Sequence, residues 1–204
     1  MGIEYFKLPI FDRRPYCDPA EWAQRYRYMK TTASMFSFEQ SPYFELPNQV
    51  MGDLAGTACV VLKVPSQTGK TETLINMLGW IVEYDRANTL LIMDTKTSGI
   101  ALSKNRIRPF LRDVCGLDYS KTASSKGKDN DHSMNAVDLG IGRGANVKIG
   151  SSRCAGDLCS TPVKYLLMDE LDRWQQEIRG EGDPISLAFQ RQLRFRGMTV
   201  MCST

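Results

Sequence analysis

The segment from Val64 to Thr71 constrains the fold of this chain more than any other. It ends in Gly69-Lys70-Thr71 and follows an apolar, β-branched run at residues 58–64. A strand, a glycine-containing loop and a helix in this order form a phosphate-binding loop, because backbone N–H groups and the positive end of the helix dipole both favour a phosphate. Lys70 is then expected to reach the β- and γ-phosphates, and Thr71 to offer its hydroxyl to Mg²⁺.

The match to the phosphate-loop pattern is incomplete, since Val64 stands where the pattern has its first glycine. The alternative is an ordinary strand–turn–helix connection with a solvated lysine. Apolar residues at helical spacing after Thr71 favour the phosphate loop. They are Leu74, Ile75, Leu78, Ile81 and Val82.

A second apolar run, residues 163–168, ends in Asp169-Glu170. Adjacent acids at the carboxyl end of a buried strand are the other half of a P-loop NTPase. Asp169 is predicted to hold Mg²⁺, directly or through water, and Glu170 to orient or activate the attacking water. The alternative is a core strand with two solvated acids. The order of the two motifs, about one hundred residues apart, favours the NTPase.

Composition indicates a soluble, intracellular globular protein. Apolar residues make up 42% and charged residues 24% of the chain, and the net charge of +3 permits a polyanionic partner without requiring one. No signal peptide or membrane-length apolar run is evident. The six cysteines fit no common zinc pattern and are expected to be reduced, with Cys59 and Cys202 buried in strands. The single histidine, His132, is expected to be solvated.

Alternation of buried strands with helices predicts an α/β fold with a mainly parallel central sheet flanked by helices. We expect an N-terminal helical arm at residues 1–55 and a P-loop core at residues 56–204. Asp18 and Pro19 predict the start of the first helix. Residues 116–146 break the pattern and are expected to form a mobile loop or a β-excursion. The expected helices are 18–30, 48–54, 71–84, 98–114 (capped by Thr97 or Ser98) and 185–195, and the expected strands are 58–64, 88–94, 147–151, 163–168 and 198–202.

Taken in order, several stretches resemble the ATPase domain of the large terminase subunit of tailed phages, in particular its lambda-like branch. The likeness covers nearly the whole chain. The stretches are Glu21-Trp22-Ala23 with Tyr26, Ser41-Pro42-Tyr43 through Pro47, Pro65 to Glu72, Asp94-Thr95, Leu167 to Asp172, Gly182 to Ala188 with Arg191 and Arg194, and Ser203-Thr204.

The resemblance implies a RecA/ASCE-like ATPase that uses ATP and Mg²⁺ to drive double-stranded DNA into a procapsid, in the cytoplasm of a bacterial host. The implied partners are DNA, the portal and procapsid, a small terminase subunit and further copies of the chain, with no membrane. DNA phosphates are expected to contact the basic helix 98–114 or the segment 116–146; the alternative is a solvated cationic face. The implied site residues are Gln67, Thr68, Gly69, Lys70, Thr71 and Glu72 for the nucleotide, Gln49 for adenine, Thr71 and Asp169 for Mg²⁺, Lys70 and Glu170 for catalysis, and Ser203 and Thr204 for coupling.

Two features depart from the family. Its phosphate loop often carries a basic residue that acts as an arginine-like finger, but Val64 and Ser66 occupy those positions here. A replacement is expected from Lys63, from Arg191 or Arg194, or from a neighbouring subunit. The family also carries a nuclease domain with clustered acids after the ATPase, and we expect no DNA-cutting site in this chain.

Two other functions fit part of the pattern. A helicase-type ATPase is one, because Asp169 to Asp172 also fits an Asp-Glu-x-Asp box. A non-catalytic nucleotide-binding or assembly module is the other, since the loop lacks the expected cation.

Overall fold

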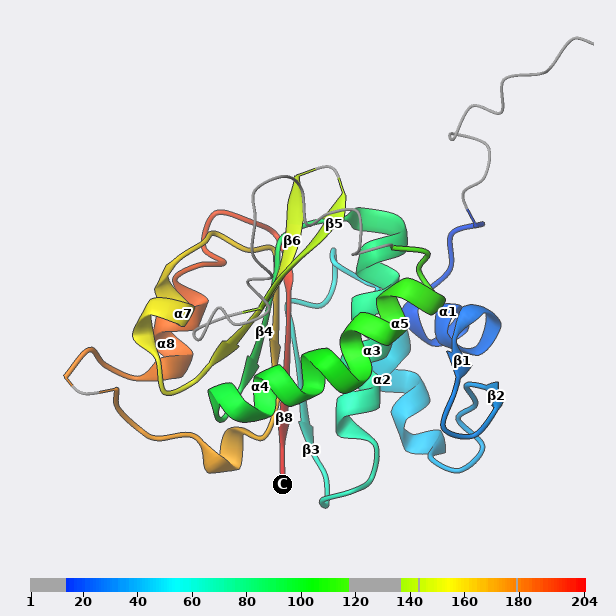
Figure 1. Ribbon diagram of the computed structural model, residues 1–204, viewed down its shortest axis with the longest axis horizontal. Helices are drawn as coiled ribbons and strands as arrows, with labels where there is room; N and C mark the ends of the chain where they lie inside the picture. The colour runs from blue at the N-terminus through cyan, green and yellow to red at the C-terminus, as the bar shows by residue number, and fades with distance from the viewer. Residues whose placement is uncertain (1–13, 118–136, 143, 179) are drawn as a thin grey trace, which may run out of the picture.

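In a computed structural model, the chain forms a six-stranded sheet with helices on both faces (Figure 1). The structure describes residues 14–117, 137–142, 144–178 and 180–204. The prediction for His132 lies outside them, as do residues 1–13 of the predicted N-terminal arm and residues 118–136 of the predicted loop.

The chain alternates between helices and strands, with short 3₁₀ or π-helical turns written η. In chain order the elements are α1 (Pro19–Tyr26), β1 (Tyr28–Met29), β2 (Ser34–Met35), η1 (Pro42–Phe44), α2 (Glu45–Val50), β3 (Cys59–Lys63), α3 (Lys70–Trp80), η2 (Ile81–Asp85), β4 (Thr89–Met93), α4 (Lys96–Leu102), η3 (Ser103–Ile107), α5 (Arg108–Asp113), β5 (Val137–Gly142), β6 (Ala145–Ser151), α7 (Ala155–Cys159), β7 (Tyr165–Met168), η4 (Leu171–Arg173), α8 (Pro184–Phe189) and β8 (Met198–Ser203).

The strands of the sheet follow the order β3-β8-β7-β4-β6-β5. Every neighbouring pair is parallel except β5 and β6, which run antiparallel. The prediction of a mainly parallel sheet is therefore confirmed. Strand β8 lies between the strand before the phosphate loop and the strand before Asp169, so the end of the chain comes between the two predicted motifs.

Burial along the strands follows their place in the sheet. The inner strands β4 and β7 are buried at every position, as expected for strands covered on both faces. The edge strand β3 alternates instead: Val60 and Leu62 point inward, whereas Cys59 is exposed. The prediction of a buried Cys59 is wrong because only one face of this edge strand is covered. Cys202, on an inner strand, is buried as predicted.

The two faces of the sheet are covered by different helices (Figure 1). Helices α3, α4 and α5 cover one face, with α1 and α2 packed on α3; α7 and α8 cover the other. Trp22 of α1 is fully buried and shares one hydrophobic cluster with α3 and the sheet. The N-terminal segment thus contributes to the main core, while a domain boundary near residue 55 stays a prediction.

Two predicted helices in the N-terminal segment have different bounds in the structure. The first begins as predicted: the Asp18 carboxylate accepts from the backbone N–H groups of Ala20 and Glu21. It ends at Tyr26 instead of near residue 30, because β1 follows and pairs with β2. Helix α2 starts at Glu45 instead of residue 48, because the 3₁₀ turn η1 leads directly into it.

The elements after β4 also correct the predictions. Thr95, not Thr97 or Ser98, caps α4, and Ser98 completes the capping box from the third helical position. The predicted helix 98–114 is interrupted by the π-helical turn η3. Helix α8 ends at Phe189, six residues before the predicted 195, where the chain continues as turns. The predicted β-excursion corresponds to β5, paired with β6.

Candidate active site

Three segments far apart in sequence meet at one edge of the sheet. Parallel strands present their carboxyl ends at the same edge, where α/β proteins bind ligands. Here β3 leads into the loop before α3, β7 into Asp169, and β8 into Thr204. In Figure 1 the end of the chain lies at the same end of the sheet as the loop between β3 and α3. Strand order therefore brings the predicted motifs together.

Lys70 lies within its own loop. Its Nζ donates to the backbone oxygens of Val64 at 2.8 Å and Pro65 at 3.1 Å, and to Oγ1 of Thr204 at 2.9 Å. Gly69 has a φ of 107°, in the left-handed region that glycine adopts without steric penalty. The loop thus turns sharply enough to enclose the ammonium group.

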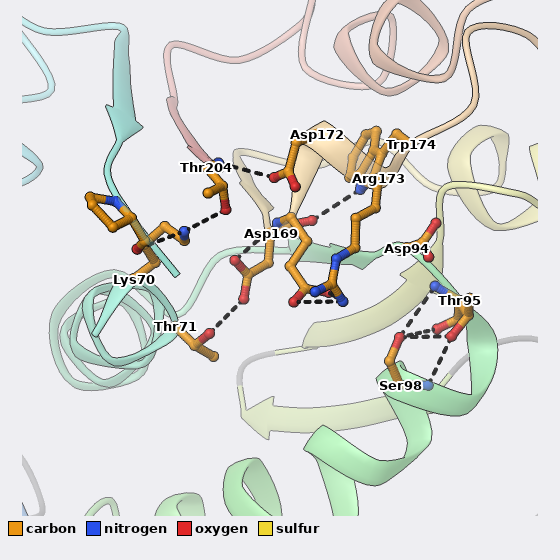
Figure 2. A network of polar contacts seen from close by, with 12 residues as sticks. Lys70, Thr71, Asp94, Thr95, Ser98, Asp169, Asp172, Arg173, Trp174 and Thr204 are labelled. Atoms are coloured by element: carbon orange, nitrogen blue, oxygen red, sulfur yellow. Dashed lines mark hydrogen bonds and ion pairs between the residues drawn. The ribbon is translucent and has the colours of Figure 1, made fainter. Parts of the chain in front are cut away.

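Thr71 and Asp169 are in direct contact. The Thr71 hydroxyl donates to Oδ2 of Asp169 at 2.7 Å, and the backbone N–H of Glu170 donates to Oδ1 at 3.0 Å (Figure 2). Asp169 is 1% exposed, and this burial raises its pKa, although the hydrogen bond from Thr71 acts in the opposite direction. A hydroxyl beside a buried carboxylate offers the oxygen ligands that Mg²⁺ prefers. The two predicted metal ligands therefore fit this ion.

Glu170 follows directly, and its backbone is left-handed with a φ of 54°. That conformation is uncommon for a residue other than glycine and often marks functional sites. The Glu170 carboxylate pairs with Arg173 at 3.2 Å. The indole Nε1 of Trp174 donates to the Asp169 carbonyl at 3.0 Å, so the turn η4 folds back against the end of β7. Sequence reasoning missed Arg173, although its place three residues after Glu170 was the available signal.

Thr204 connects this turn to the phosphate loop. Its hydroxyl accepts from Lys70, while its backbone N–H donates to Oδ1 of Asp172 at 3.0 Å. Burial acts to raise the pKa of Asp172, but hydrogen bonds, led by the one from Thr204, outweigh it and lower that pKa below its ordinary value. Ser203 accepts through its carbonyl from the backbone N–H of Val64 at 3.2 Å. Both predicted coupling residues thus contact the phosphate-loop segment.

Some predicted site residues lie away from this edge or face other partners. The Glu72 carboxylate pairs with the guanidinium groups of Arg27 and Arg106 on the side of α3 that faces the N-terminal segment. Gln49 is exposed on α2. Gln67, with a φ of 61°, and Thr68, whose hydroxyl donates to Pro65, shape the phosphate loop.

The three predicted finger residues are not gathered at the site. Lys63 is exposed at the end of β3. Arg191 donates to the carbonyl of Cys159 at 3.2 Å, and its own carbonyl accepts from Val163, just before β7 begins. Arg191 therefore lies at the opposite end of the sheet and does not reach the phosphate loop of its own chain. Arg194, exposed, follows in the same segment.

A cavity of about 430 Å³ borders the phosphate loop. Thr68 and Gly69 form part of its wall, and the ring of Phe44 comes within 3.5 Å of the position that a Cβ on Gly69 would take. The rest of the wall includes Met35, Phe36, Phe38 and Thr73. Gln49 does not belong to this wall.

Two negative findings hold for the residues that the structure describes. Within those ranges, no cluster of three or more His, Cys, Asp or Glu side chains is arranged to hold a metal ion. A site of one carboxylate and one hydroxyl, as at Asp169 and Thr71, is not of that kind. None of the helices in the same ranges is long and apolar enough to cross a bilayer.

Comparison with known proteins gives one family. Residues 31–204 match the model of the family described as "Phage terminase large subunit gpA, ATPase domain". No curated protein matches the chain. Two solved structures that resemble it are the large terminase ATPase domain of Thermus phage P74-26 and a mutant of that domain. The domain is 14% identical to this chain, with a TM-score of 0.46, and the match covers 80% of this chain and 68% of the domain structure. The mutant is 13% identical, with a TM-score of 0.47, and the match covers 80% of this chain and 69% of the mutant structure.

Proposed function

Since this chain belongs to the family of the phage terminase large subunit gpA ATPase domain, and is thus an ATPase domain of a viral DNA-packaging motor, we propose that the carboxyl edge of its sheet binds and hydrolyses ATP with Mg²⁺. The observation that carries the proposal is the contact between Thr71 and Asp169, from two segments 98 residues apart in sequence. With Lys70 beside them, these groups offer one triphosphate a cation, a hydroxyl and a metal-binding carboxylate.

In the proposed site Thr71 and Asp169 hold Mg²⁺, which offsets the charge of the phosphate oxygens. Lys70 exchanges the carbonyls of Val64 and Pro65 for the β- and γ-phosphates. Phosphate oxygens are charged acceptors, and charge-assisted hydrogen bonds are roughly twice as strong as neutral ones, so this exchange is favourable. The same movement removes the Lys70 contact from Thr204.

Thr204 is therefore our candidate for coupling. In the structure its hydroxyl is bonded to Lys70 and its backbone N–H to Asp172. When Lys70 turns to the phosphates, Thr204 keeps its link to the turn η4 and loses its link to the loop. Ser203 and Thr204 would thus report the state of the nucleotide to the turn η4.

Glu170 is proposed to orient the attacking water and accept its proton. It follows Asp169 directly, and its left-handed backbone turns the chain sharply at the end of β7. Preorganised groups of this kind supply most of the rate gain in phosphoryl transfer, because the protein does little covalent chemistry.

The cavity beside Gly69 is proposed to receive the base of the nucleotide. Its wall combines aromatic rings, with Phe44 nearest the loop, and polar side chains such as Glu39 and Gln40. Rings beside a few polar groups suit a flat heterocycle. Gln49, which the sequence analysis proposed as the adenine contact, lies on α2, the helix that follows Phe44. Its contact with adenine stays a prediction.

The finer assignments of partners and chemistry remain proposals. The family implies DNA and packaging partners in general. We propose the portal and procapsid, a small terminase subunit and further copies of the chain as those partners. The basic segment from α4 to α5 is proposed to contact DNA phosphates, although one of its cations, Arg106, is paired with Glu72. The absence of a nuclease site stays a prediction from the sequence.

Substitution of the water-orienting carboxylate tests the proposed function. Glu170→Gln keeps the shape of the side chain but cannot accept a proton, so we expect ATP affinity to persist and turnover to fall by roughly 10²- to 10⁴-fold. ATP affinity is measured by calorimetry, and phosphate release is measured with DNA and procapsid present.

Glu181→Gln, which changes an exposed glutamate in the same part of the chain, is the matched control. Wild-type turnover by Glu170→Gln would show that another group prepares the water. A wild-type chain that binds ATP but releases no phosphate under any of these conditions would favour the non-catalytic module. Strand separation without packaging would favour the helicase.

A further inference from the structure

The proposed reaction needs positive charge beside the γ-phosphoryl group, where negative charge spreads in the transition state. Residues 64–71 contain a single Lys or Arg, Lys70. Lys63 lies on the exposed side of an edge strand, and Arg191 lies at the other end of the sheet. Arg194 follows Arg191 in the same segment. Within one chain, the second cation is therefore expected from a residue that the sequence analysis did not consider, and a neighbouring subunit is the alternative source.

Two arginines close to this edge are already engaged. Arg153 forms a bidentate pair with Asp94, with three hydrogen bonds of 2.8–3.0 Å. Arg106 pairs with Glu72, which also pairs with the buried Arg27. Both contacts join elements of the fold, since Asp94 follows β4 and Glu72 belongs to α3. Releasing Arg153 would leave the largely buried Asp94 carboxylate without its ion-pair partner, which is strongly unfavourable. Releasing Arg106 would break a contact between η3 and α3, although Glu72 would keep its pair with Arg27.

Arg173 differs from these two arginines in its exposure and in the position of its partner. Its side chain is 60% exposed and pairs with Glu170, the residue next to the proposed metal ligand Asp169. Exposed ion pairs of this kind contribute little to stability, so the guanidinium can change partners at little energetic cost. In Figure 2 the Arg173 side chain extends from its turn toward the region where Asp169 and Thr71 meet.

The backbone that carries Arg173 is held in place from both sides. On one side the carboxylate of Asp172 accepts from the backbone N–H of Thr204, and on the other the indole of Trp174 donates to the Asp169 carbonyl. The Arg173 N–H itself donates to the carbonyl of Glu170 at 2.9 Å. A fixed backbone that carries an exposed side-chain end is the arrangement expected of a group that must meet a ligand in one geometry.

We propose, resting on the proposed function, that Arg173 is the second cation of the ATP site: it pairs with Glu170 in the nucleotide-free chain and transfers to the γ-phosphate when ATP binds. A phosphate offers the planar guanidinium two oxygens at once and more charge than a carboxylate. The transfer frees the Glu170 carboxylate to receive water. As the water oxygen bonds to phosphorus, the bond to the ADP oxygen breaks, the water proton passes to Glu170, and Arg173 offsets the developing charge.

The test compares two ligands of the full chain in the presence of Mg²⁺: ADP, and ADP with aluminium fluoride, which imitates the transferring phosphoryl group. Calorimetry gives both affinities for the wild type, Arg173→Ala and Arg173→Lys. We expect ADP affinity to stay within about twofold, because Arg173 does not contact ADP. Affinity for the fluoride complex should fall roughly 10- to 100-fold in Arg173→Ala, as for loss of a hydrogen bond to a charged group. Arg173→Lys should recover part of it, since lysine keeps the charge without the fork.

Arg25→Ala is the matched control, because Arg25 also forms an exposed ion pair with a nearby glutamate, Glu21 on α1. It should leave both affinities unchanged. Circular dichroism on every variant shows that it is folded, and Arg173→Lys keeps the test valid if Arg173→Ala does not fold.

A comparison in the Glu170→Gln background separates direct contact from action through Glu170. If Arg173 contacts the phosphoryl group, Arg173→Ala weakens the fluoride complex by the same factor there. If the loss disappears in that background, or if Arg173→Ala binds the fluoride complex like the wild type, the inference is wrong. It is also wrong if the wild type binds ADP but gains no affinity with fluoride. A wild type that binds no ADP would instead contradict the proposed function.

Discussion

The two faces of the sheet are covered by helices of different length. On one face, the eleven-residue helix α3 is buried beneath α1 and beside α5. The opposite face is covered by α7, of five residues, and α8, of six residues. The first face contains large aromatic side chains such as Trp22, Trp80 and Phe110. The second is built around smaller groups, among them Ala155, Leu158 and Ala188. Isolated helices as short as α7 and α8 are marginal in water, so packing on the sheet must hold them, helped in α8 by the Asp183 cap.

The proposed active site lies at the edge where the two faces meet. Lys70 donates to loop carbonyls and to Thr204, and Arg173 is exposed. The structure thus separates groups that bind ligand from groups that hold the fold. Substitutions at the edge should change nucleotide binding at nearly constant stability, and those within a face should do the reverse.

Lys70→Ala should have the largest effect and test that separation directly. Lysine hydrogen bonds to two phosphates are charge-assisted, and at about 1.5–3 kcal/mol each their loss weakens ATP binding by roughly 10²- to 10⁴-fold. Calorimetry measures the affinity, and thermal unfolding without nucleotide measures stability. Unchanged affinity would contradict the phosphate-loop assignment. A larger loss of stability than in Trp22→Ala would show that edge and core are not separate.

Trp22→Ala should produce the largest loss of stability on the α3 face. The side chain is fully buried and lies edge-on to Phe110, with ring centroids 6.1 Å apart. Removing such a residue typically lowers the free energy of unfolding by about 3–5 kcal/mol. Urea unfolding measures this, and ATP affinity is compared at a temperature where both proteins are folded. A loss below about 1 kcal/mol would mean that the N-terminal segment packs only loosely on α3.

Those parts of the site that depend on local patterns were predictable from sequence. Lys70 and Thr71 follow a strand and open a helix, and Asp169 ends a buried strand, so each motif indicates its own position. That they meet also requires the strand order, with β8 inserted beside β3. Strand order is a tertiary property, which is why Arg191 could be proposed as a finger although it lies at the other end of the sheet.

Other features depend on backbone conformations that residue type does not favour. Glu170 adopts a left-handed conformation that sequence patterns assign to glycine or asparagine, and this turn determines where Arg173 lies. Helix 98–114 is predicted as one element from its capping residues, which carry no signal for the π-helical turn η3 that interrupts it. In both places tertiary contacts determine the backbone, and a single sequence does not display them.

A pair of glycine substitutions compares the two faces with one added methyl group each. A Cβ on Gly79 of α3 would lie 2.0 Å from the Trp22 ring and 2.7 Å from Phe110, both too close. Neither ring can move freely in a packed core, so Gly79→Ala should lose about 1–3 kcal/mol despite the better helix propensity of alanine. Gly156 of α7 has its nearest neighbour at 3.9 Å, and Gly156→Ala should gain about 0.4–1 kcal/mol. Thermal unfolding measures the change in stability of both variants. Equal changes would show that the two faces do not differ in packing at these glycines.

Helix caps should give the smallest effects, and they extend the comparison to pH. Asp18 caps α1 on one face and Asp183 caps α8 on the other, each followed by proline. Either Asp→Ala substitution should cost about 1 kcal/mol at neutral pH. Because α8 is short, the loss at Asp183 should also lower protection of its amides from hydrogen exchange, whereas α1 keeps its packing through Trp22. Equal loss of protection in both helices would show that α8 is held by packing as firmly as α1.

The pH dependence follows from the state of the Asp183 carboxylate. Burial acts to raise its pKa, but hydrogen bonds from Ser186 and from the Ile185 N–H outweigh it, so its pKa is lower in the folded chain than its ordinary value. A lowered pKa means that the stabilisation is present above the unfolded-state pKa, about 3.9, and is lost as pH falls through the folded-state value. The difference in unfolding free energy between the wild type and Asp183→Ala should therefore shrink in acid. Asparagine caps a helix without ionising, so the difference in unfolding free energy between Asp183→Asn and Asp183→Ala should be the same at every pH. The difference in unfolding free energy between the wild type and Asp183→Ala could instead stay constant from neutral pH to pH values below the folded-state pKa. That result would mean that the carboxylate charge does not contribute to the cap.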